Sequence, residues 1–425
     1  MASPQQPADG TKIFGTWKEG APRDHLPKDH WWELFGDPVL NHFEEQTLSA
    51  NYELKAALAR LEQSRATARV ARSALFPEIS VDPAYGRERY SPNQEPSFGA
   101  ITATTIRAPI DLSYEIDIFG RVRHGFEAAR AETAASAAAY QNLLLTLQAD
   151  VAVNYFRLRA LDSEVAAVAR TVGLRQEQLS LVKGRFDAGI GNDLDIARAQ
   201  TELANTEAEA AALARQRAEL ENALAILTAN NPSNFRVAAD ASNSTFWNPE
   251  PPLVPVGLPS ELLERRPDVA EAERQIAAAN ARVGIARAAA FPVVRLTGTA
   301  GFLSADFDSV FNWESRIWSL GPSVSLPIFS GGRIRAEKAR ANAAHEEAIA
   351  RYRQRVLVAF GDVENSLATI KFLATQKEAQ DRALANARKA AALADTRYKA
   401  GFVGYLDVVD ASREVLQFER ASVQL

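Results

Sequence analysis

The sequence predicts a mainly α-helical fold with a membrane β portion, in which two halves of the chain are related by an internal duplication. Three observations in the 425 residues support this fold class. A residue pattern returns after about 212 positions, two stretches of more than sixty residues contain no proline, and two pairs of segments alternate apolar and polar residues. Uninterrupted helix formers and period-two alternation are typical of long helices and of two-faced strands, respectively.

The duplication is clearest in a turn. The run Arg185-Phe-Asp-Ala-Gly189, followed by Leu194-Asp-Ile, returns as Arg397-Tyr-Lys-Ala-Gly401, followed by Leu406-Asp-Val. Phe76-Pro77 also returns as Phe291-Pro292. Solenoid repeats have periods of roughly 20–50 residues, so a period this long indicates a duplicated domain half.

Each half is predicted to run through a helix, a β-hairpin, a very long helix and a returning helix. At about 1.5 Å per residue, the long helix of the first half would measure roughly 95 Å, too much for a compact domain. Because the last helix is too short to match its counterpart in the first half, we expect about twenty native residues beyond Leu425. The expected elements are an N-terminal extended segment 1–40, a first half 41–230 (helix 41–75, hairpin 76–119, helices 120–184 and 194–230), a linker 231–266, and a second half 267–425 (helix 267–290, hairpin 291–329, helices 333–399 and 405–425).

The strands carry the membrane signal. Between Thr105 and Ile118, isoleucine, alanine, leucine and tyrosine alternate with polar residues over a length suited to a tilted membrane strand. Four strands cannot close a barrel in lipid, since open edges leave backbone groups unpaired. Two copies would give a barrel that side chains fill, whereas three give a trimeric 12-stranded β-barrel with an aqueous interior, continued by a hollow α-helical barrel. The residues predicted to face the barrel lumen are Arg107, Asp111, Glu115 and Asp117.

Composition excludes several functions. The chain has no cysteine, a formal net charge of −5 and five histidines without metal-site spacing. This argues against disulfides, thiolate metal sites and nucleic-acid binding. Phosphate loops, dinucleotide fingerprints and nucleophile elbows do not occur in the sequence either. We therefore expect a non-catalytic protein without cofactor or metal.

The repeated turn is the strongest candidate site. Gly189 and Gly401 follow long helices at the position of a left-handed cap, and Asp195 and Asp407 come six residues later. For these aspartates the simpler interpretation is that they balance the positive end of a helix. In the second turn, Leu406, Asp410 and Arg413 share a helix face that Asp407 adjoins. Repeated in a trimer, this face would form a ring that selects cations and that Asp–Arg pairs between chains could lock. The alternative is a local surface pair of Asp410 and Arg413.

Four motifs then suggest a family. They are Trp31-Trp-Glu-Leu-Phe-Gly-Asp-Pro38, Asp111-Leu-Ser-Tyr-Glu-Ile-Asp-Ile-Phe-Gly-Arg121, Leu258-Pro-Ser-Glu-Leu-Leu-Glu-Arg-Arg-Pro-Asp-Val269 and Leu326-Pro-Ile-Phe-Ser-Gly-Gly-Arg333. In this order they resemble TolC-type outer-membrane efflux factors, most closely the NodT-like lipoprotein branch that serves resistance–nodulation–division pumps. The resemblance covers nearly the whole chain. It implies a trimeric outer-membrane channel with a periplasmic α-barrel, docked through an adaptor (membrane fusion) protein onto a proton-driven inner-membrane transporter.

The resemblance also assigns residues. It implies a periplasmic gate, a pair that links neighbouring helices, and a tip that contacts the adaptor. One departure is Val403, which stands where some members have an arginine that helps to close the channel. The gate residues are Phe402, Leu406, Asp407, Asp410 and Arg413; the helix-linking pair is Tyr398 and Asp195, expected to share a hydrogen bond; and the tip glycines are Gly189, Gly191, Gly401 and Gly404.

The amino terminus departs from the lipoprotein branch. Members of that branch carry an acylated N-terminal cysteine, and this chain has no cysteine. We expect that the native anchor precedes Met1-Ala-Ser and was trimmed, the alternative being a native member without lipid. A second class of function also stays open, namely a soluble coiled-coil scaffold or periplasmic adaptor without a barrel. The sequence does not identify the exported substrate.

Overall fold

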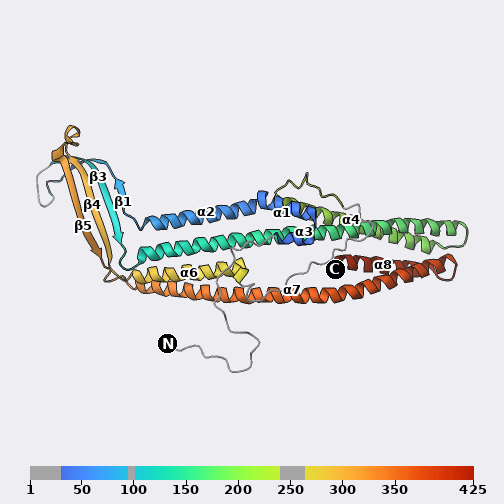
Figure 1. The fold of residues 1–425 in the computed structure, drawn as a ribbon. Helices are drawn as coiled ribbons and strands as arrows, with labels where there is room; N and C mark the ends of the chain where they lie inside the picture. Colours follow the sequence, from blue (N-terminus) through green and yellow to red (C-terminus); the bar gives the residue numbers. More distant parts are fainter. Residues whose placement is uncertain (1–29, 94–100, 240–263) are drawn as a thin grey trace, which may run out of the picture. The chain divides into compact units, whose positions relative to one another are not determined.

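The computed structural model describes residues 30–93, 101–239 and 264–425 (Figure 1). The described chain divides into two compact units, and the two longest helices each contribute residues to both. One unit contains residues 58–93, 101–141 and 264–357, and the other contains residues 30–57, 142–239 and 358–425. Most of the expected linker 231–266 and most of the expected extended segment 1–40 lie outside the described residues.

The helices and strands alternate in the order of the duplication. The helices are α1 (Pro38–Ala50), α2 (Tyr52–Ser73), α3 (Arg121–Asp187), α4 (Asp193–Leu227), α6 (Pro267–Ala288), α7 (Arg333–Lys399) and α8 (Tyr405–Gln424). The strands are β1 (Glu78–Val81), β2 (Ala84–Arg89), β3 (Thr102–Ile116), β4 (Val293–Ser304) and β5 (Arg316–Ser325).

The start of the described chain differs from the extended segment that the sequence predicts. Trp31–Phe35 forms a 3₁₀ turn, and α1 already begins at Pro38. Asp37 causes this early start, because its carboxylate accepts hydrogen bonds from the backbone N–H groups of Val39 at 2.8 Å and Leu40 at 3.2 Å. An acidic N-cap followed by proline at the first helical position is a strong helix-start signal.

The single helix expected over 41–75 is interrupted at Asn51. This residue leaves the helical conformation with ψ near 129°. Its side chain forms hydrogen bonds with both α2 and α4. Its Oδ1 accepts from the backbone N–H of Leu54 at 3.0 Å, and its Nδ2 donates to the carbonyl of Leu227 at 2.8 Å. The break thus caps α2 and ties it to the end of α4.

The sheet is antiparallel, with the strand order β1–β3–β4–β5 and with β2 also paired to β3. β1 and β2 are two pieces of one strand, because Val81 pairs with Ile110 and Ala84 pairs with Arg107 in the same register. Asp82 and Pro83 separate them. Proline has no N–H to donate to a ladder, so the expected first strand is interrupted there.

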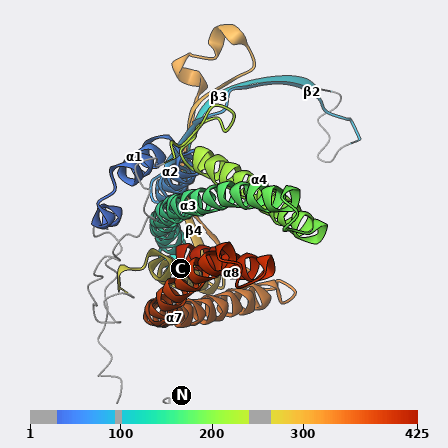
Figure 2. The same cartoon turned by 90° about the vertical axis from the view of Figure 1, so that its right-hand side faces the viewer.

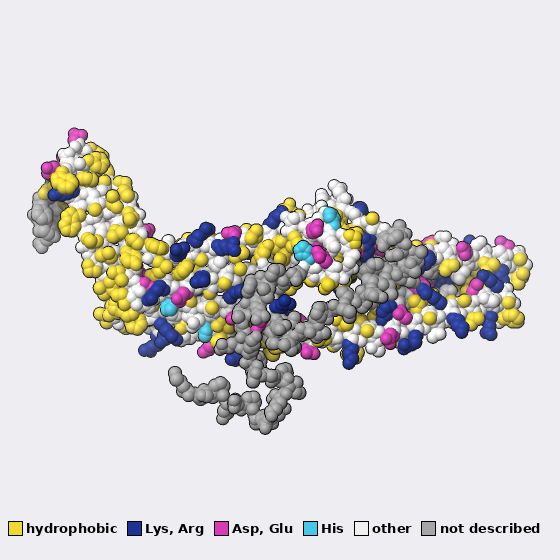
Figure 3. Space-filling model, viewed as in Figure 1, with side chains coloured by type: hydrophobic (Ala, Val, Ile, Leu, Met, Phe, Trp, Pro, Cys, Tyr) yellow, Lys and Arg dark blue, Asp and Glu magenta, His cyan; other side chains and the backbone are white. Residues whose placement is uncertain are grey.

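The register gives the sheet one apolar and one polar face. Leu112, Gly298 and Leu320 align across β3, β4 and β5 on one face, as do Ile110, Ala300 and Trp318. On the other face, Glu115 aligns with Arg295 and Ser323. Figure 3 shows hydrophobic side chains gathered over the strands, and Trp318 and Leu320 are exposed. An exposed apolar sheet face of this kind marks a surface that a membrane or another protein covers.

A close backbone approach shapes the middle of the sheet. Gly301 on β4 lies opposite Pro109 on β3, and a Cβ atom at Gly301 would lie 2.3 Å from the carbonyl oxygen of Ala108. Only glycine fits at that distance. A proline and a glycine in adjacent strands, next to the Asp82–Pro83 break, are typical of sites where a sheet bends.

Small residues also let helices approach in the same unit. A Cβ atom at Gly284 on α6 would lie 2.6 Å from the His124 ring on α3. Arg282 of α6 forms an ion pair with Glu132 of α3, and Ser64 of α2 donates to the hydroxyl of Thr133 of α3 at 3.3 Å. These contacts join three helices of the unit that contains the sheet.

The second unit has an aromatic and aliphatic core around the middle of α3. Its largest fully buried side chains include Tyr155, Leu158, Leu40 and Leu224, which come from α3, α1 and α4. The hydroxyl of Tyr155 donates to the Asp37 carboxylate at 2.5 Å. The core therefore fixes the same residue that starts α1.

A smaller core lies at the far ends of the helices in this unit. It joins the α3–α4 hairpin to the α7–α8 hairpin, which lie side by side (Figure 2). Its buried residues are Val182, Ala199, Tyr398, Tyr405, Val408 and Val409. We call the end of the two hairpins, residues 176–206 and 391–421, the helical tip.

Candidate functional site

The two turns of the helical tip have the same backbone hydrogen bonds. Gly189 has φ 73° and Gly401 has φ 80°, both in the left-handed region. After α3, Gly189 N–H donates to Phe186 and Ile190 N–H donates to Arg185, each at 2.9 Å. After α7, Gly401 and Phe402 repeat these bonds to Tyr398 and Arg397 at 3.0 and 2.9 Å. This paired pattern is the Schellman motif, and it explains why each turn requires a glycine.

The starts of the returning helices are capped in different ways. The side chain of Asn192 accepts a hydrogen bond from the backbone N–H of Asp195 at 2.8 Å. The equivalent residue, Gly404, has no side chain to do this, and instead the carboxylate of Asp407 accepts from the Gly404 N–H at 3.0 Å. Asp195 and Asp407 therefore both lie in a first helical turn, where a negative charge is favourable.

Gly191, the remaining predicted tip glycine, is packed rather than left-handed. A Cβ atom there would lie 3.0 Å from the backbone nitrogen of Phe186. The turn after α3 thus folds back closely onto the helix end.

Apolar side chains project from equivalent positions of the two turns. Ile190 and Phe402 are 71% and 82% exposed, and Leu194 and Leu406 are also exposed. Each pair is separated by 212 positions, the period of the duplication. The helical tip thus exposes apolar side chains that do not pack into its own core.

Four of the five predicted gate residues lie on the outer side of α8, and the fifth, Phe402, lies in the turn before it. Leu406, Asp407, Asp410 and Arg413 are exposed, whereas Tyr405, Val408 and Val409 face the tip core. Arg413 Nη1 lies 3.6 Å from the carboxylate of Asp410. The structure therefore contains the local pair, but Arg413 has a stronger partner.

That partner is Glu202 on α4. Arg413 Nε donates to Glu202 Oε2 at 3.0 Å, and its Nη2 donates to Oε1, which makes the pair bidentate. The pKa of Arg413 is raised, first of all by this hydrogen bond. Such fork-to-fork pairs are among the strongest side-chain interactions, so Arg413 is directed toward α4.

Glu202 also contacts a buried arginine on α3. Arg175 is 2% exposed and its Nη2 lies 3.5 Å from Glu202 Oε2. Burial lowers the pKa of Arg175, because it removes water from the charged group. One carboxylate therefore faces two guanidinium groups.

A second ion-pair group follows two helical turns further along α8. Arg420 contacts Glu209 on α4 and Glu164 on α3 through different guanidinium nitrogens. On the α7 side, Arg388 donates to Glu419 at 2.6 Å. α8 is thus held by charged groups from three helices of its unit.

The predicted helix-linking pair is not joined in this structure. Besides the backbone bonds of its helix and turn, Tyr398 accepts a hydrogen bond at its carbonyl from Arg185 at 3.3 Å. The Arg185 guanidinium also lies over the Tyr398 ring, 4.7 Å from its centre. Asp195 lies 3.9 Å from Arg198. Arg185 thus contacts Tyr398 at its carbonyl and at the face of its ring.

The residues predicted to face a lumen lie on or just beyond β3. Arg107 is exposed, and Asp111 accepts from the hydroxyl of Thr299 at 2.5 Å. Glu115 pairs with Arg121 at 2.7 Å, and Asp117 accepts from the backbone of Arg123 at 2.8 Å. The two acidic residues near the end of the strand are therefore neutralised by the first residues of α3.

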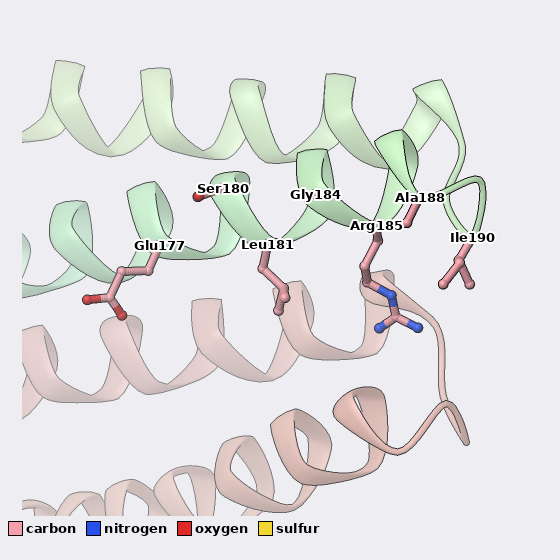
Figure 4. Close-up of a pocket in the computed structure, with 7 residues that line it drawn as sticks. All are labelled: Glu177, Ser180, Leu181, Gly184, Arg185, Ala188 and Ile190. Atoms are coloured by element: carbon pink, nitrogen blue, oxygen red, sulfur yellow. The ribbon is translucent and has the colours of Figure 1, made fainter.

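A shallow pocket lies beside the first turn of the helical tip. Residues of α3 and of the turn after it line the pocket. Gly184 is one of them, and because glycine has no side chain, its backbone forms part of the pocket wall. Figure 4 shows Glu177, Leu181 and Arg185 projecting from one side of α3, with Ile190 in the turn. Leu181 and Ile190 are exposed there.

Sequence reasoning missed Arg175, Glu202, Glu209 and Arg420. One signal was available, because Glu202 and Glu209 are seven residues apart and so are Arg413 and Arg420. Opposite charges at matched heptad spacing predict two helices in register. The distance in sequence between partners, 211 positions, is also close to the repeat period.

Neither a helical membrane span nor a metal site is found in the described residues. None of the helices in 30–93, 101–239 and 264–425 combines the length and the apolar character that crossing a membrane requires. In the same residues, no three His, Asp or Glu side chains are grouped as metal ligands would be.

Comparison with protein families decides what these two units belong to. The family model described as outer membrane efflux protein matches residues 44–230 and 258–425, which covers both halves of the duplication. The chain belongs to this family. The expected fold class is confirmed, as are the expected location in the outer membrane and the function as the outer-membrane channel component of an efflux pump.

Individual relatives agree with the family. The chain is 32% identical over 400 residues to the solvent efflux pump outer membrane protein SrpC of Pseudomonas putida, covering 93% of this chain and 83% of the relative. It is 33% identical over 402 residues to the pyoverdine export outer membrane protein OpmQ of Pseudomonas aeruginosa, covering 93% and 83%. A solved structure of the outer-membrane channel OprN has a TM-score of 0.86 at 32% identity, covering 93% of this chain and 88% of that one. These relatives match the channel interpretation rather than a soluble scaffold.

Proposed function

We propose that the protein is the passive exit duct of a tripartite efflux pump and catalyses no reaction itself. Three copies would close the sheet into one twelve-stranded barrel in the outer membrane, and the long helices would continue it as a tube through the periplasm. A periplasmic adaptor protein and a proton-driven inner-membrane transporter would supply the substrate and the energy.

The two-faced sheet carries this proposal. Its apolar face suits lipid and its polar face suits a water-filled interior, and the faces are assigned by the register rather than by alternation alone. In the described chain β5 pairs with β4, and β1 and β2 pair with β3, so each outer strand has one side available. Because lipid offers no hydrogen bonds to a strand edge, further copies of the sheet must complete the ladder.

We place the gate at the helical tip, on the face of α8 that carries Asp407, Asp410 and Arg413. In a trimer this face would form a ring around the axis, with Leu406 and Phe402 narrowing the opening. The exposed apolar residues of both turns and the glycines Gly189, Gly191, Gly401 and Gly404 would contact the adaptor. Charged rings and apolar constrictions are the usual means by which pores select and gate.

Conductance in planar bilayers tests the gate. The purified protein should conduct weakly at rest, and replacing both Asp410 and Arg413 by alanine should increase the current because the ring loses its charges. As a matched control, Arg215 and Glu219 form an exposed pair on α4, and replacing both by alanine should leave the current unchanged. A correctly inserted Asp410→Ala/Arg413→Ala variant with wild-type current would remove the gate from α8.

We expect the partner proteins, rather than the channel, to select the substrate. SrpC is described as a solvent efflux component and OpmQ as a pyoverdine export component, yet both are similar to this chain to nearly the same degree. We infer that the inner-membrane transporter selects the substrate. Exchanging this channel for that of another pump, in cells that keep their own transporter, should leave the exported compounds unchanged. A substrate range that follows the channel would contradict this.

A further inference from the structure

We propose that four residues hold α8 against α4 in the resting channel and that a fifth, Arg175, makes this hold reversible. The four residues are Glu202 and Glu209 of α4 and Arg413 and Arg420 of α8, and we call them the α4–α8 ladder. This inference rests on the proposed gate at the helical tip. It names positioning residues that act on the gate from the neighbouring hairpin.

The ladder is in register over two helical turns. Glu202 pairs with Arg413 and Glu209 pairs with Arg420, and both partners are seven positions apart on their own helices. Arg175 and the ladder residues line one groove between the hairpins. A slide or rotation of α8 against α4 would break both pairs together, so the ladder defines one relative position of the two helices.

The pair nearest the turn is built to open. Glu202 and Arg175 are both buried, whereas the Arg413 side chain is 55% exposed. If Arg413 leaves, Glu202 keeps Arg175 as its partner, and the two buried charges still compensate each other. Arg413 then returns to water, where a guanidinium group is well hydrated. No buried charge is left unpaired, which is the costly event in breaking a buried ion pair.

Arg175 also opposes the closed arrangement. It shares one carboxylate with Arg413, and the positive charge of Arg413 contributes to lowering its pKa. Two cations facing one anion repel each other at short range. Arg175 therefore weakens the Glu202–Arg413 pair while serving as the replacement partner.

The second pair has the opposite charge balance. Arg420 faces two carboxylates, Glu209 and Glu164, and Glu164 is buried. Removing Arg420 would leave Glu164 buried without this cation, at a much higher cost. Hydrogen bonds between α7 and α8 add to this hold at the same level, since Gln380 of α7 donates to the Phe418 carbonyl and Ser422 of α8 donates to Asp381. The geometry thus points to motion of the turn end of α8 about an anchor at Arg420.

Two substitutions with opposite expected effects test the ladder by bilayer conductance. Glu202→Gln removes the charge that holds Arg413 and should raise the resting current about tenfold, the change that 1.4 kcal/mol produces in an equilibrium. Arg175→Leu removes the competing cation and should lower the resting current below wild type. A merely structural role would move both variants in one direction, because each loses a buried group. Equal direction in two folded variants would overturn the proposal.

A reversible cross-link provides a second measurement. The chain has no cysteine, so Glu202→Cys/Arg413→Cys introduces the only two thiols. A short bis-methanethiosulfonate cross-linker should close the channel, and a reductant should restore a current above wild type. Arg215→Cys/Glu219→Cys is the matched control, because that pair lies within one helix and its cross-link should not alter the current. Unaltered current after complete cross-linking of positions 202 and 413 would overturn the ladder.

Failure of the ladder is distinguishable from failure of the proposed function. If Phe402→Ala/Leu406→Ala raises the current but Glu202→Gln has wild-type current, the gate stands and the ladder is wrong. If no variant conducts after verified insertion as an oligomer, the exit duct itself is contradicted and the ladder falls with it. Thermal unfolding of every variant in detergent confirms that the folded protein was measured.

Discussion

Two regions of the second unit each bury a glutamate, and they stabilise it in opposite ways. Glu44 on α1 is fully buried beside Leu40 and Thr47, and neither of its carboxylate oxygens has a hydrogen-bond partner within the described chain. Glu202 at the helical tip is also buried, yet it faces Arg413 and Arg175. The first region buries its glutamate without a charged partner, and the second buries its glutamate next to two arginines.

The difference separates a region suited to fixed packing from one suited to rearrangement. Burial raises the pKa of Glu44 to about 8, so this side chain is largely neutral at pH 7 and packs as a polar but uncharged group. Glu202 can exchange one arginine for another without losing compensation. A core that depends on apolar contacts packs closely in only one arrangement. In an ion-pair cluster with more cations than anions, the carboxylate can be paired in two arrangements.

The largest expected effect is the pH dependence that Glu44 gives to stability. The folded protein binds this proton up to a pH of about 8, whereas the unfolded chain releases it near 4.5. The contribution is therefore fully present below pH 4.5 and is lost as the pH rises toward 8. About 3.5 pH units correspond to roughly 5 kcal/mol. Denaturant unfolding at pH 5 and pH 8 measures it, and Glu44→Gln should remove most of the slope.

The neighbouring residue offers the control for this measurement. Glu45 is exposed on the same helix, so Glu45→Gln should keep the wild-type pH profile. Parallel profiles for wild type and Glu44→Gln would show that Glu44 is ionised in the folded protein and would remove one side of the comparison.

The second-largest expected effect concerns the buried charges of Glu202 and Arg175. Glu202→Leu leaves Arg175 buried without its carboxylate and should destabilise the protein by about 3 kcal/mol. The double variant Glu202→Leu/Arg175→Leu should recover most of this loss, since no buried charge remains. A double-mutant cycle of denaturant midpoints checks the coupling. Additive losses would mean that the two charges are independent.

A smaller effect concerns the backbone of the helical tip. Gly401→Ala adds a Cβ atom to a residue whose backbone stays in the left-handed conformation. Nothing lies within 4 Å of that atom, so only the cost of this backbone conformation, about 1 kcal/mol, is expected. The control is Gly173→Ala in the interior of α3, which should stabilise the helix slightly. Melting temperatures in detergent compare the two, and a stabilised Gly401→Ala would contradict the left-handed turn.

The smallest effect distinguishes the two helix starts. Asn192→Ala removes a side-chain cap and should cost about 1 kcal/mol, whereas Gly404→Ala removes no side-chain cap and should cost less. Equal shifts in melting temperature would mean that the two turns are stabilised alike, despite their different caps.

Much of this architecture could be predicted from local sequence signals. The long helix α7 follows from a proline-free run of helix formers that ends in a glycine cap, and the sheet faces follow from alternation that the register keeps from strand to strand. The turns at Gly189 and Gly401 could be placed because their motif repeats at the period of the duplication.

What could not be predicted depends on contacts between distant residues. Asn51 breaks a helix because its amide reaches the carbonyl of Leu227, a partner 176 positions away. Arg413 was expected to act on Asp410 in its own helix or on another chain, but its guanidinium reaches Glu202 of α4. Local patterns identify which residue is charged, and only the packed helices determine which partner it meets.

The α4–α8 ladder has a consequence for the history of the duplication. Glu202 has an acidic equivalent in the second half, Glu414, but Arg413 has Thr201 as its equivalent in the first half. In this pair the acid is therefore present in both copies and the base in only one, whereas Glu209 and Arg420 have Ala421 and Ala208 as their equivalents. An ancestor built from six identical half-length chains would have had the same helix contacts all around its ring. In the present chain, the halves differ at the positions of Glu209, Arg413 and Arg420, so the contact that carries the ladder is charged in a way that its duplicate is not.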